Sequence, residues 1–290
     1  MLPTIGFIGT GVMGKSMASH LLAGGYSVRV YNRTEEKAKD LVEQGAIWCE
    51  SPKVVASESD LIITMVGFPK DVQSVYLGPE GLIENSRAGT LLIDMTTSSP
   101  ILAEEIEKEA MIKGLYALDA PVSGGDVGAR EARLSIMVGG EKEALAQAMP
   151  VFKVMGKQIS HMGKAGMGQH TKMSNQIAIA SNMMGVCEAL WYAERSGLDV
   201  KSVLEAISAG AAGSASLANL GPRILRKDYA PGFYIKHFIK DMKIALDSAE
   251  EMKIDLPGLK LSLKLYEELA QKGHENEGTQ GLIQWYYTQV

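Results

Sequence analysis

A glycine-rich turn near the start of the chain constrains its fold more than any other feature. Residues 4–8 form an uncharged apolar run, which predicts a buried parallel strand. This run leads into Gly9-Thr10-Gly11-Val12-Met13-Gly14, a GxGxxG turn, followed by a helical stretch and a second strand at residues 27–31. In a βαβ unit of about 30 residues, such a turn lets backbone N–H groups approach a pyrophosphate at the helix N-terminus. We therefore expect this turn to bind a dinucleotide.

The end of the second predicted strand bears on the choice of dinucleotide. NAD-binding sites usually place Asp or Glu here to accept hydrogen bonds from the ribose hydroxyls, whereas this chain has Asn32-Arg33-Thr34. A carboxylate would repel a 2′-phosphate, but an arginine guanidinium and a threonine hydroxyl can hold one. We expect NADP in preference to NAD. The alternative, a solvated turn before a helix that begins near Glu35, stays open.

Composition excludes several other functions. With 290 residues, 46% of them hydrophobic, the chain is long enough for two domains with substantial cores. A net charge of -5 gives no electrostatic footprint for nucleic acid, and no apolar run has the roughly 18 residues of a membrane span. The N-terminus passes straight into the first strand without a visible signal peptide. Cys49 and Cys187 each lie in an apolar stretch, and we expect buried thiols in a cytoplasmic protein. The five histidines have no metal-ligand spacing, so no metal is expected.

The chain changes character after residue 163. Before it, helical stretches alternate with further predicted strands at 61–66, 90–95, 115–118 and 134–138. Ser51-Pro52 and Ser99-Pro100 are typical of helix starts, with serine as the N-cap and proline in the first turn. This pattern predicts an α/β fold over residues 1–163, a Rossmann-type doubly wound parallel sheet that binds the dinucleotide.

Only helices are predicted after the glycine-rich stretch 163–168, at 168–196, 200–207, 237–252 and 259–271. We therefore expect residues 164–290 to form an all-α domain for substrate binding and oligomerisation. The first of these helices is apolar around most of its circumference, so we expect burial on nearly all sides. A central core helix and an interface of an oligomer would both satisfy that expectation.

Candidate ligand-binding residues follow the predicted strands, because open α/β sheets bind ligands beyond the carboxyl ends of their strands. Pro69 follows the predicted strand at 61–66, Thr96-Thr97 follow the strand at 90–95, and residues 119–125 follow the next. Within that segment, Ser123-Gly124-Gly125 could bring backbone N–H groups close to an anion, although an ordinary glycine turn explains it equally well.

The second group of candidates lies on predicted helices. Lys172 and Asn175 are one turn apart, so they share a helical face. A lysine on a helix is usually only a solvated charge. Lys240 and Asp241 begin another helical segment, with His237 one turn earlier.

Four ordered segments resemble motifs of the β-hydroxyacid dehydrogenase family, and the resemblance runs essentially from end to end. They are GFIGTGVMG at 6–14, DAPVSGG at 119–125, GQHTKMSNQ at 168–176 and KHFIKDMKIAL at 236–246. The family includes 3-hydroxyisobutyrate dehydrogenases, tartronate semialdehyde reductases and glyoxylate/succinic semialdehyde reductases. The VYNRT ending of the second strand is most similar to the NADPH-using glyoxylate/succinic semialdehyde reductase branch. Glu277-Gly278-Thr279-Gln280 departs from the family's Asp-x-Ser-Ala element, which leaves the substrate open.

The resemblance implies hydride transfer between NADP(H) and a small 3-hydroxy acid, semialdehyde or 2-oxo acid. Lys172 would protonate the reacting oxygen and Asn175 would orient it. The resemblance places the substrate carboxylate at Ser123, Gly124 and Gly125, and makes His237 and Asp241 further substrate-binding candidates. Cofactor contacts would come from the GxGxxG turn and from Asn32, Arg33, Thr34, Met65, Val66, Thr96 and Lys240. It also implies a homodimer or homotetramer.

Several alternatives stay open at this point. The chain could be an NAD-dependent 3-hydroxyisobutyrate or tartronate semialdehyde dehydrogenase/reductase, or a cofactor-binding protein that has lost catalysis. Imine reductases resemble the family but usually lack a lysine at position 172, and 6-phosphogluconate dehydrogenases have a much longer helical domain. His237 could equally face the substrate or serve as a packing or capping residue.

Overall fold

In the computed structural model, which describes residues 2–289, the chain forms two compact units. The first ends at Lys172 and the second starts at Met173, so the division falls within one continuous helix, α9 (Met167–Arg195). No helix of the described residues is long and apolar enough to cross a membrane.

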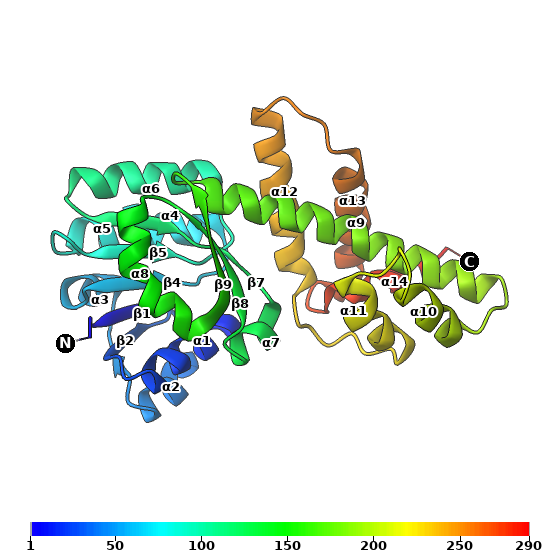
Figure 1. The fold of residues 1–290 in the computed structure, drawn as a ribbon, viewed down its shortest axis with the longest axis horizontal. Coiled ribbons are helices and arrows are strands. Elements are labelled where there is room, and N and C mark those ends of the chain that lie inside the picture. The colour runs from blue at the N-terminus through cyan, green and yellow to red at the C-terminus, as the bar shows by residue number, and fades with distance from the viewer. Residues whose placement is uncertain (1, 290) are drawn as a thin grey trace. The chain divides into compact units, whose positions relative to one another are not determined.

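The first unit is built on a sheet whose main part is parallel (Figure 1). Six strands in the order β3-β2-β1-β4-β5-β6 pair in parallel. They are β1 (Ile5–Ile8), β2 (Val28–Tyr31), β3 (Ile47–Trp48), β4 (Leu61–Thr64), β5 (Leu91–Asp94) and β6 (Tyr116–Asp119). The order reverses between β1 and β4, as expected for a doubly wound sheet, and the predicted fold class is confirmed. Of these six strands, the sequence analysis did not predict β3, which is two residues long.

Helices cover both faces of this sheet, which explains why its strands are almost continuously apolar. Alternate residues of β1 serve different cores: Phe7 packs into the core that includes α1 (Val12–Ala23) and α8 (Lys142–Met155), whereas Ile8 packs into the other core. That second core takes side chains from α3 (Pro52–Glu58), α4 (Pro69–Leu77), α5 (Leu82–Asn85) and α6 (Pro100–Ile112). The chain between β2 and β3 forms a 3₁₀ turn (Glu35–Ala38) and α2 (Lys39–Glu43).

Both serine-proline helix starts are confirmed. Ser51 Oγ accepts a hydrogen bond from Val54 N–H at 3.4 Å, and Ser99 Oγ accepts one from Leu102 N–H at 3.5 Å. Pro52 and Pro100 occupy the first turns of α3 and α6, where a missing N–H costs nothing.

The far side of the sheet departs from the prediction of an all-parallel arrangement. The predicted strand at 134–138 is β8 (Leu134–Gly139), and it runs antiparallel to β6, with Gly139 opposite Asp119. Between β6 and β8 the chain offers only β7 (Val122–Ser123) and the six-residue helix α7 (Gly125–Arg130). A helix this short spans about 9 Å, too little to carry the chain back for a parallel strand. An unpredicted strand, β9 (Gly156–Gly163), then pairs in parallel with β8.

The second unit is helical, as predicted. It contains the rest of α9, then α10 (Val200–Ser208), α11 (Ala215–Leu225), α12 (Ile235–Glu251), α13 (Pro257–Leu269) and α14 (Ile283–Tyr287). A π-helical turn (Ala270–His274) and a 3₁₀ turn (Thr279–Leu282) connect the last two. Phe238 and Tyr266, both fully buried, stack edge to face in its core with ring centroids 5.2 Å apart. Helix α11 was missed because Pro222 lies inside it, although its N-cap Ser214 was a visible start signal.

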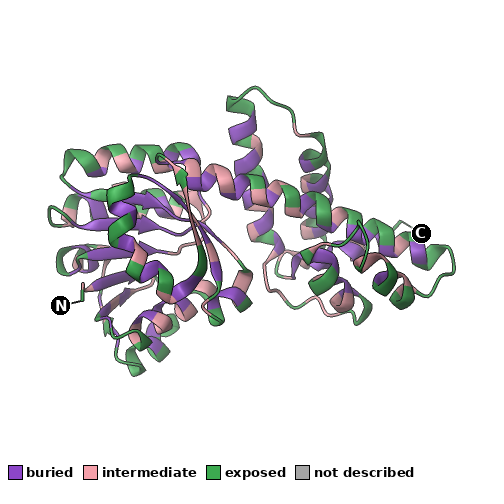
Figure 2. Cartoon of the chain, viewed as in Figure 1, coloured by how far each residue is buried: buried purple, intermediate pink, exposed green. Residues whose placement is uncertain are grey.

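Within the single chain, α9 is not buried on nearly all sides, so it is not the central core helix of the first alternative; burial in an oligomer stays a prediction (Figure 2). One face of the helix packs into the core of the second unit through Met183, Val186, Cys187 and Leu190. The opposite face is exposed and carries Ser181, Asn182, Gly185, Ala189 and Tyr192. Small and polar residues interrupt the apolar circumference here, so the helix is amphipathic over this stretch. Cys187, on the packed face, and Cys49 are free and buried, as predicted.

Candidate active site

The GxGxxG turn connects β1 to α1, and two of its glycines are fixed by packing within the chain. Gly9 has φ of +98°, and a Cβ there would lie 2.2 Å from the carbonyl oxygen of Met65. A Cβ at Gly14 would lie 1.9 Å from the carbonyl oxygen of Gly9. At Gly11, by contrast, a Cβ would meet nothing within 4 Å. The chain itself therefore does not require this glycine, whereas a ligand lying against the loop would.

The first turn of α1 has the features of an anion-binding helix start. Its N-cap, Gly11, provides no side-chain cap, and the first turn carries no acidic residue. The Oγ1 of Thr10 is buried and has no hydrogen-bond partner within residues 2–289. The free N–H groups and this orphaned hydroxyl fit the pyrophosphate of a dinucleotide.

Asn32 and Arg33 follow β2 directly, but the structure gives them different contacts. Asn32 Oδ1 accepts a hydrogen bond from Thr10 N–H at 3.1 Å, and its Nδ2 donates to the Thr34 carbonyl at 2.8 Å. Asn32 therefore ties the end of β2 to the glycine loop. The side chain of Arg33 is 77% exposed, and its Nη1 lies 2.9 Å from Asp71 Oδ1. Of the predicted trio, Arg33 is thus the side chain that projects a positive charge into solvent at this edge.

Thr96 belongs to a buried network at the ends of β4 and β5. Its Oγ1 accepts a hydrogen bond from Val66 N–H at 3.0 Å, and its N–H donates to Asp94 Oδ1 at 3.1 Å. Asp94 also accepts from Thr64 Oγ1 at 2.8 Å. Thr96 is 1% exposed, so it holds the loop that carries Met65 and Val66 in place.

The Ser123-Gly124-Gly125 segment has the unusual backbone that its sequence predicts. Gly124 and Gly125 have φ of +131° and +63°, a region that favours glycine. Ser123 ends β7, where it pairs with Ser135 of β8. The segment follows β6 by a few residues, so it lies beyond the same carboxyl edge as the glycine loop.

Lys172 and Asn175 lie on successive turns of α9. Lys172, the last residue of the first unit, is only 7% exposed, so it is not the solvated charge that a helical lysine usually is. Asn175 is half-buried in the second unit.

In the second unit, Asn175 is connected to Asp241 through a residue that was not predicted. Asn175 Nδ2 donates to Gln176 Oε1 at 2.7 Å, and Gln176 Nε2 donates to Asp241 Oδ2 at 2.6 Å. Lys240 Nζ lies 3.0 Å from the other oxygen of Asp241. Both ends of this buried chain of contacts are predicted site residues, so Gln176 positions them relative to each other.

His237 lies one turn before Lys240 on α12 and is half-buried. Burial lowers the pKa of its imidazole, and the positive charge of Lys240 lowers it further. Its ring packs edge to face against Tyr234 at 5.9 Å between centroids.

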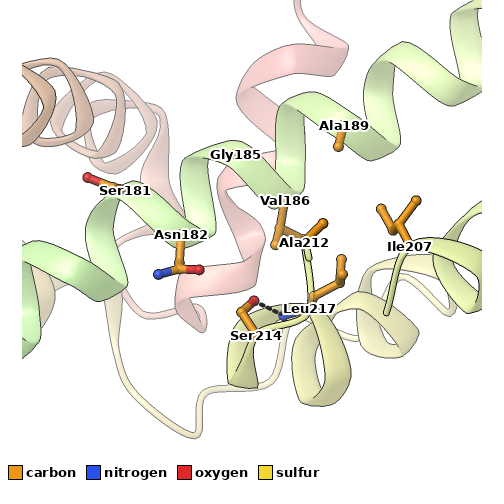
Figure 3. Close-up of a pocket in the computed structure, with 9 residues that line it drawn as sticks. All are labelled: Ser181, Asn182, Gly185, Val186, Ala189, Ile207, Ala212, Ser214 and Leu217. Atoms are coloured by element: carbon orange, nitrogen blue, oxygen red, sulfur yellow. Dashed lines mark hydrogen bonds between the residues drawn. The ribbon is translucent and has the colours of Figure 1, made fainter. Parts of the chain in front are cut away.

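A cavity of about 420 Å³ lies within the second unit, between α9, α10 and α11 (Figure 3). Its lining combines small and apolar residues of α9 (Gly185, Val186 and Ala189) with Ile207 and Leu217 on the other side, and it also includes the polar residues Ser181, Asn182 and Ser214. None of the predicted site residues lines it. Within residues 2–289, no cluster of three or more His, Cys, Asp or Glu side chains could hold a metal ion.

The fold and the carboxyl-edge loops define a protein with a Rossmann-type dinucleotide-binding domain followed by a helical domain. Residues 4–163 match the family model described as the NAD binding domain of 6-phosphogluconate dehydrogenase. Residues 166–286 match the one described as NAD-binding of NADP-dependent 3-hydroxyisobutyrate dehydrogenase. The chain belongs to the β-hydroxyacid dehydrogenase family of nicotinamide-dependent oxidoreductases.

Individual relatives agree with this assignment. The chain is 58% identical to the uncharacterized oxidoreductase YkwC of Bacillus subtilis, over 97% of this chain and 98% of that protein. It is 50% identical to the probable mitochondrial 3-hydroxyisobutyrate dehydrogenase-like 1 of Arabidopsis thaliana, over 96% and 84% of the two chains. A solved structure of Mycobacterium tuberculosis 3-hydroxyisobutyrate dehydrogenase with L-serine superposes with a TM-score of 0.90 at 29% identity, covering 100% of both chains.

Proposed function

We propose that this protein reduces a small carboxylate-bearing aldehyde or 2-oxo acid with NADPH, with glyoxylate and succinic semialdehyde as the expected substrates. The observation that carries the proposal is Lys172, a lysine buried to 7% exposure one helical turn from Asn175, in a chain of the β-hydroxyacid dehydrogenase family. Burying an ammonium group is costly, so such a lysine is more often a functional group than a surface charge.

The residues have separate roles in this proposal. The bound dinucleotide supplies the hydride, which adds to the carbonyl carbon of the substrate. As the carbonyl oxygen gains negative charge, the Lys172 ammonium transfers a proton to it, so the C=O double bond becomes a C–O–H group. Asn175 orients that oxygen. The backbone at Ser123, Gly124 and Gly125 holds the substrate carboxylate, with Asp241 and His237 as further substrate contacts.

Cofactor binding is assigned to the carboxyl edge of the sheet. Gly11 and the uncapped start of α1 would hold the pyrophosphate, because the chain leaves room and free donors there. Arg33 and Thr34 contact the 2′-phosphate, while Asn32 supports the loop. By family resemblance, Thr96, Met65, Val66 and Lys240 would contact the nicotinamide side. The preference for NADP is supported by the exposed guanidinium of Arg33 and by the lack of an acidic residue at positions 32–34.

A second candidate is the oxidation of a 3-hydroxy acid. The Mycobacterium tuberculosis relative was solved with L-serine, which is itself a small 3-hydroxy acid with a carboxylate. The same site would serve: the oxidised dinucleotide would accept the hydride from the carbon that bears the hydroxyl group, and the neutral amine of Lys172 would accept the hydroxyl proton.

The test is oxidation of NADPH and NADH at 340 nm, measured as kcat/KM with glyoxylate, succinic semialdehyde, tartronate semialdehyde and methylmalonate semialdehyde. The reverse reaction is measured with 3-hydroxyisobutyrate. We expect the highest kcat/KM with NADPH and either glyoxylate or succinic semialdehyde. A preference for NADH, or activity with 3-hydroxyisobutyrate alone, would favour the second candidate. Cofactor binding without turnover of any of these compounds would refute both.

A further inference from the structure

We propose that Asp119 and Gln169 are positioning residues for Lys172, because they fasten the first turn of α9 to the carboxyl ends of β5 and β6. The inference rests on the proposed role of Lys172 as the proton donor. It adds two residues that lie outside the proposed cofactor and substrate contacts.

Asp119, the last residue of β6, caps α9 from a distant part of the chain. Its Oδ1 accepts a hydrogen bond from Gly166 N–H at 2.9 Å, and its Oδ2 accepts one from Gln169 N–H at 2.7 Å. The carboxyl group is 3% exposed. Helix starts are commonly capped by a serine, threonine or aspartate that directly precedes them. A local cap moves with its helix, whereas this cap fixes the helix to the sheet.

Gln169 attaches the same turn to the chain that follows β5. Its Oε1 accepts a hydrogen bond from Ser98 N–H at 2.9 Å, and its Nε2 donates to the Thr96 carbonyl at 2.8 Å. The side chain is fully buried, with 0% exposure. Both hydrogen-bonding groups of this amide are therefore used, and both bind backbone groups of one short segment.

The helix start also lies directly against the backbone of the sheet. A Cβ at Gly168 would lie 2.5 Å from the Met137 carbonyl oxygen and 2.6 Å from that of Asp119. A Cβ at Gly139, opposite Asp119 in the sheet, would lie 2.8 Å from Gly168 N. With this close packing and the four hydrogen bonds, the first turn cannot slide or rotate without breaking buried contacts.

Lys172 follows Gln169 by three residues, which is about 4.5 Å along the helix axis. The position of its Cα is thus set by the clamp formed by Asp119 and Gln169. Proton transfer requires the ammonium to lie within hydrogen-bond reach of the reacting oxygen, and a misplacement of about 1 Å can cost roughly 100-fold in rate. Thr96 is bonded by Gln169 and also holds the Val66 loop, so the clamp connects the helix with the ends of β4, β5 and β6.

The experiment is a double-mutant cycle on the full-length enzyme. Gln169→Met has a similar volume and removes both amide hydrogen bonds. It is made in the wild-type and in the Lys172→Ala background. Thr171→Val is the matched control, because Thr171 Oγ1 donates within its own helix, to the Met167 carbonyl at 2.8 Å. Turnover with saturating NADPH and aldehyde, the Kd for NADPH and the melting temperature are measured for each variant.

We expect Gln169→Met to lower kcat by about 10- to 100-fold in the wild-type background, with the Kd for NADPH within about threefold. In the Lys172→Ala background, Gln169→Met should lower kcat by less than about twofold, because there is no longer a lysine to position. Thr171→Val should stay within about twofold in both backgrounds. If Gln169→Met does not fold, the cycle is made with Gln169→Glu, which keeps the acceptor for Ser98 and loses the donor to Thr96.

Two results would overturn the positioning role and leave the proposed function intact. One is an equal loss of kcat in both backgrounds, and the other is no loss of kcat beyond about threefold in the wild-type background. A Lys172→Ala enzyme within about tenfold of wild type would instead refute the proposed proton donor, and the positioning role with it. The two failures are therefore distinguishable.

Discussion

Arg33 and Asp71 form an ion pair of 2.9 Å that joins the end of β2 to the first turn of α4. The arginine side chain is 77% exposed and the aspartate side chain 11% exposed. Asp71 is held from the other side, because its Oδ2 accepts a hydrogen bond from Phe68 N–H at 3.1 Å. The carboxylate is thus held by the backbone, whereas the guanidinium is open to solvent on its other sides.

This pair predicts how cofactor preference can be changed. Arg33→Ala should raise the KM for NADPH by about 10- to 100-fold, because a charged hydrogen bond contributes about 1.5–3 kcal/mol. The KM for NADH should change less than about threefold. Arg29→Ala is the control, since Arg29 lies within β2, pairs with Glu58 at the end of α3 and has no proposed cofactor contact. An equal loss for both cofactors would contradict the assignment of Arg33 to the 2′-phosphate.

Substitution of Asp71 should lower the KM for NADPH, the opposite of the effect of Arg33→Ala. Asp71→Asn keeps an acceptor for Phe68 N–H but removes the charge that competes with a phosphate for Arg33. We expect the KM for NADPH to fall a few-fold, with the effect abolished in the Arg33→Ala background. Steady-state kinetics at low and high salt would measure this, and a rise in the KM for NADPH would show that Asp71 orients Arg33 rather than competing for it.

Lys172 is the residue on which the proposed chemistry depends most. Lys172→Ala should lower kcat for aldehyde reduction by about 10²–10⁴-fold, the usual contribution of a positioned acid–base group. The Kd for NADPH, measured by fluorescence, should stay within about threefold of the wild-type value. Lys172→Arg keeps the positive charge but is a much poorer proton donor. We therefore expect it to bind cofactor normally and remain impaired.

The parts of this structure that were predicted from the sequence depend on neighbours along the chain. Gly9 adopts a positive φ within its own turn, Gly14 packs against Gly9 in the same turn, and Ser51 and Ser99 cap helices that begin at the next residue. Each of these features follows from a local rule about backbone conformation or hydrogen bonding.

The parts that were missed depend on contacts between distant segments. Gln169 bonds to Ser98, Gln176 to Asp241 and Asp71 to Arg33, partners 71, 65 and 38 residues apart. A polar residue on a helix is usually solvated, so nothing local distinguishes these side chains from surface residues. The direction of β8 was missed for a related reason, because it is set by the length of the connection and not by the apolar pattern of the strand.

Asp119 predicts a specific dependence of stability on pH. Burial raises the pKa of its carboxyl group to about 7, whereas an aspartate in an unfolded chain titrates near about 3.9. Between these values the folded state binds the extra proton, so the stability contributed by this group is fully present below about pH 4 and is lost as the pH rises through 7. Between these two pKa values, the free energy of unfolding falls by up to about 1.4 kcal/mol per pH unit.

The measurement is urea unfolding of wild type and Asp119→Asn at pH 5, 6, 7 and 8. The asparagine does not titrate, so any pH-independent cost of the substitution leaves the slope of unfolding free energy against pH unchanged. From pH 5 to 8, the wild type should lose roughly 2–3 kcal/mol of unfolding free energy relative to the variant. A difference in unfolding free energy that is independent of pH would contradict the raised pKa.

The two glycines of α9 give a final prediction with an internal control. A Cβ at Gly168 would lie 2.5 Å and 2.6 Å from two carbonyl oxygens, whereas a Cβ at Gly185 would meet nothing within 4 Å. Gly168→Ala should therefore force the helix start away from β6 and lower the free energy of unfolding by about 1–3 kcal/mol. Gly185→Ala should raise it by up to about 1 kcal/mol, because alanine is the better helix former. Thermal unfolding of both variants would measure the two shifts, and kcat would fall for Gly168→Ala only. If both substitutions stabilised the protein equally, the close packing of α9 against the sheet would be wrong, and the basis for positioning Lys172 would be lost.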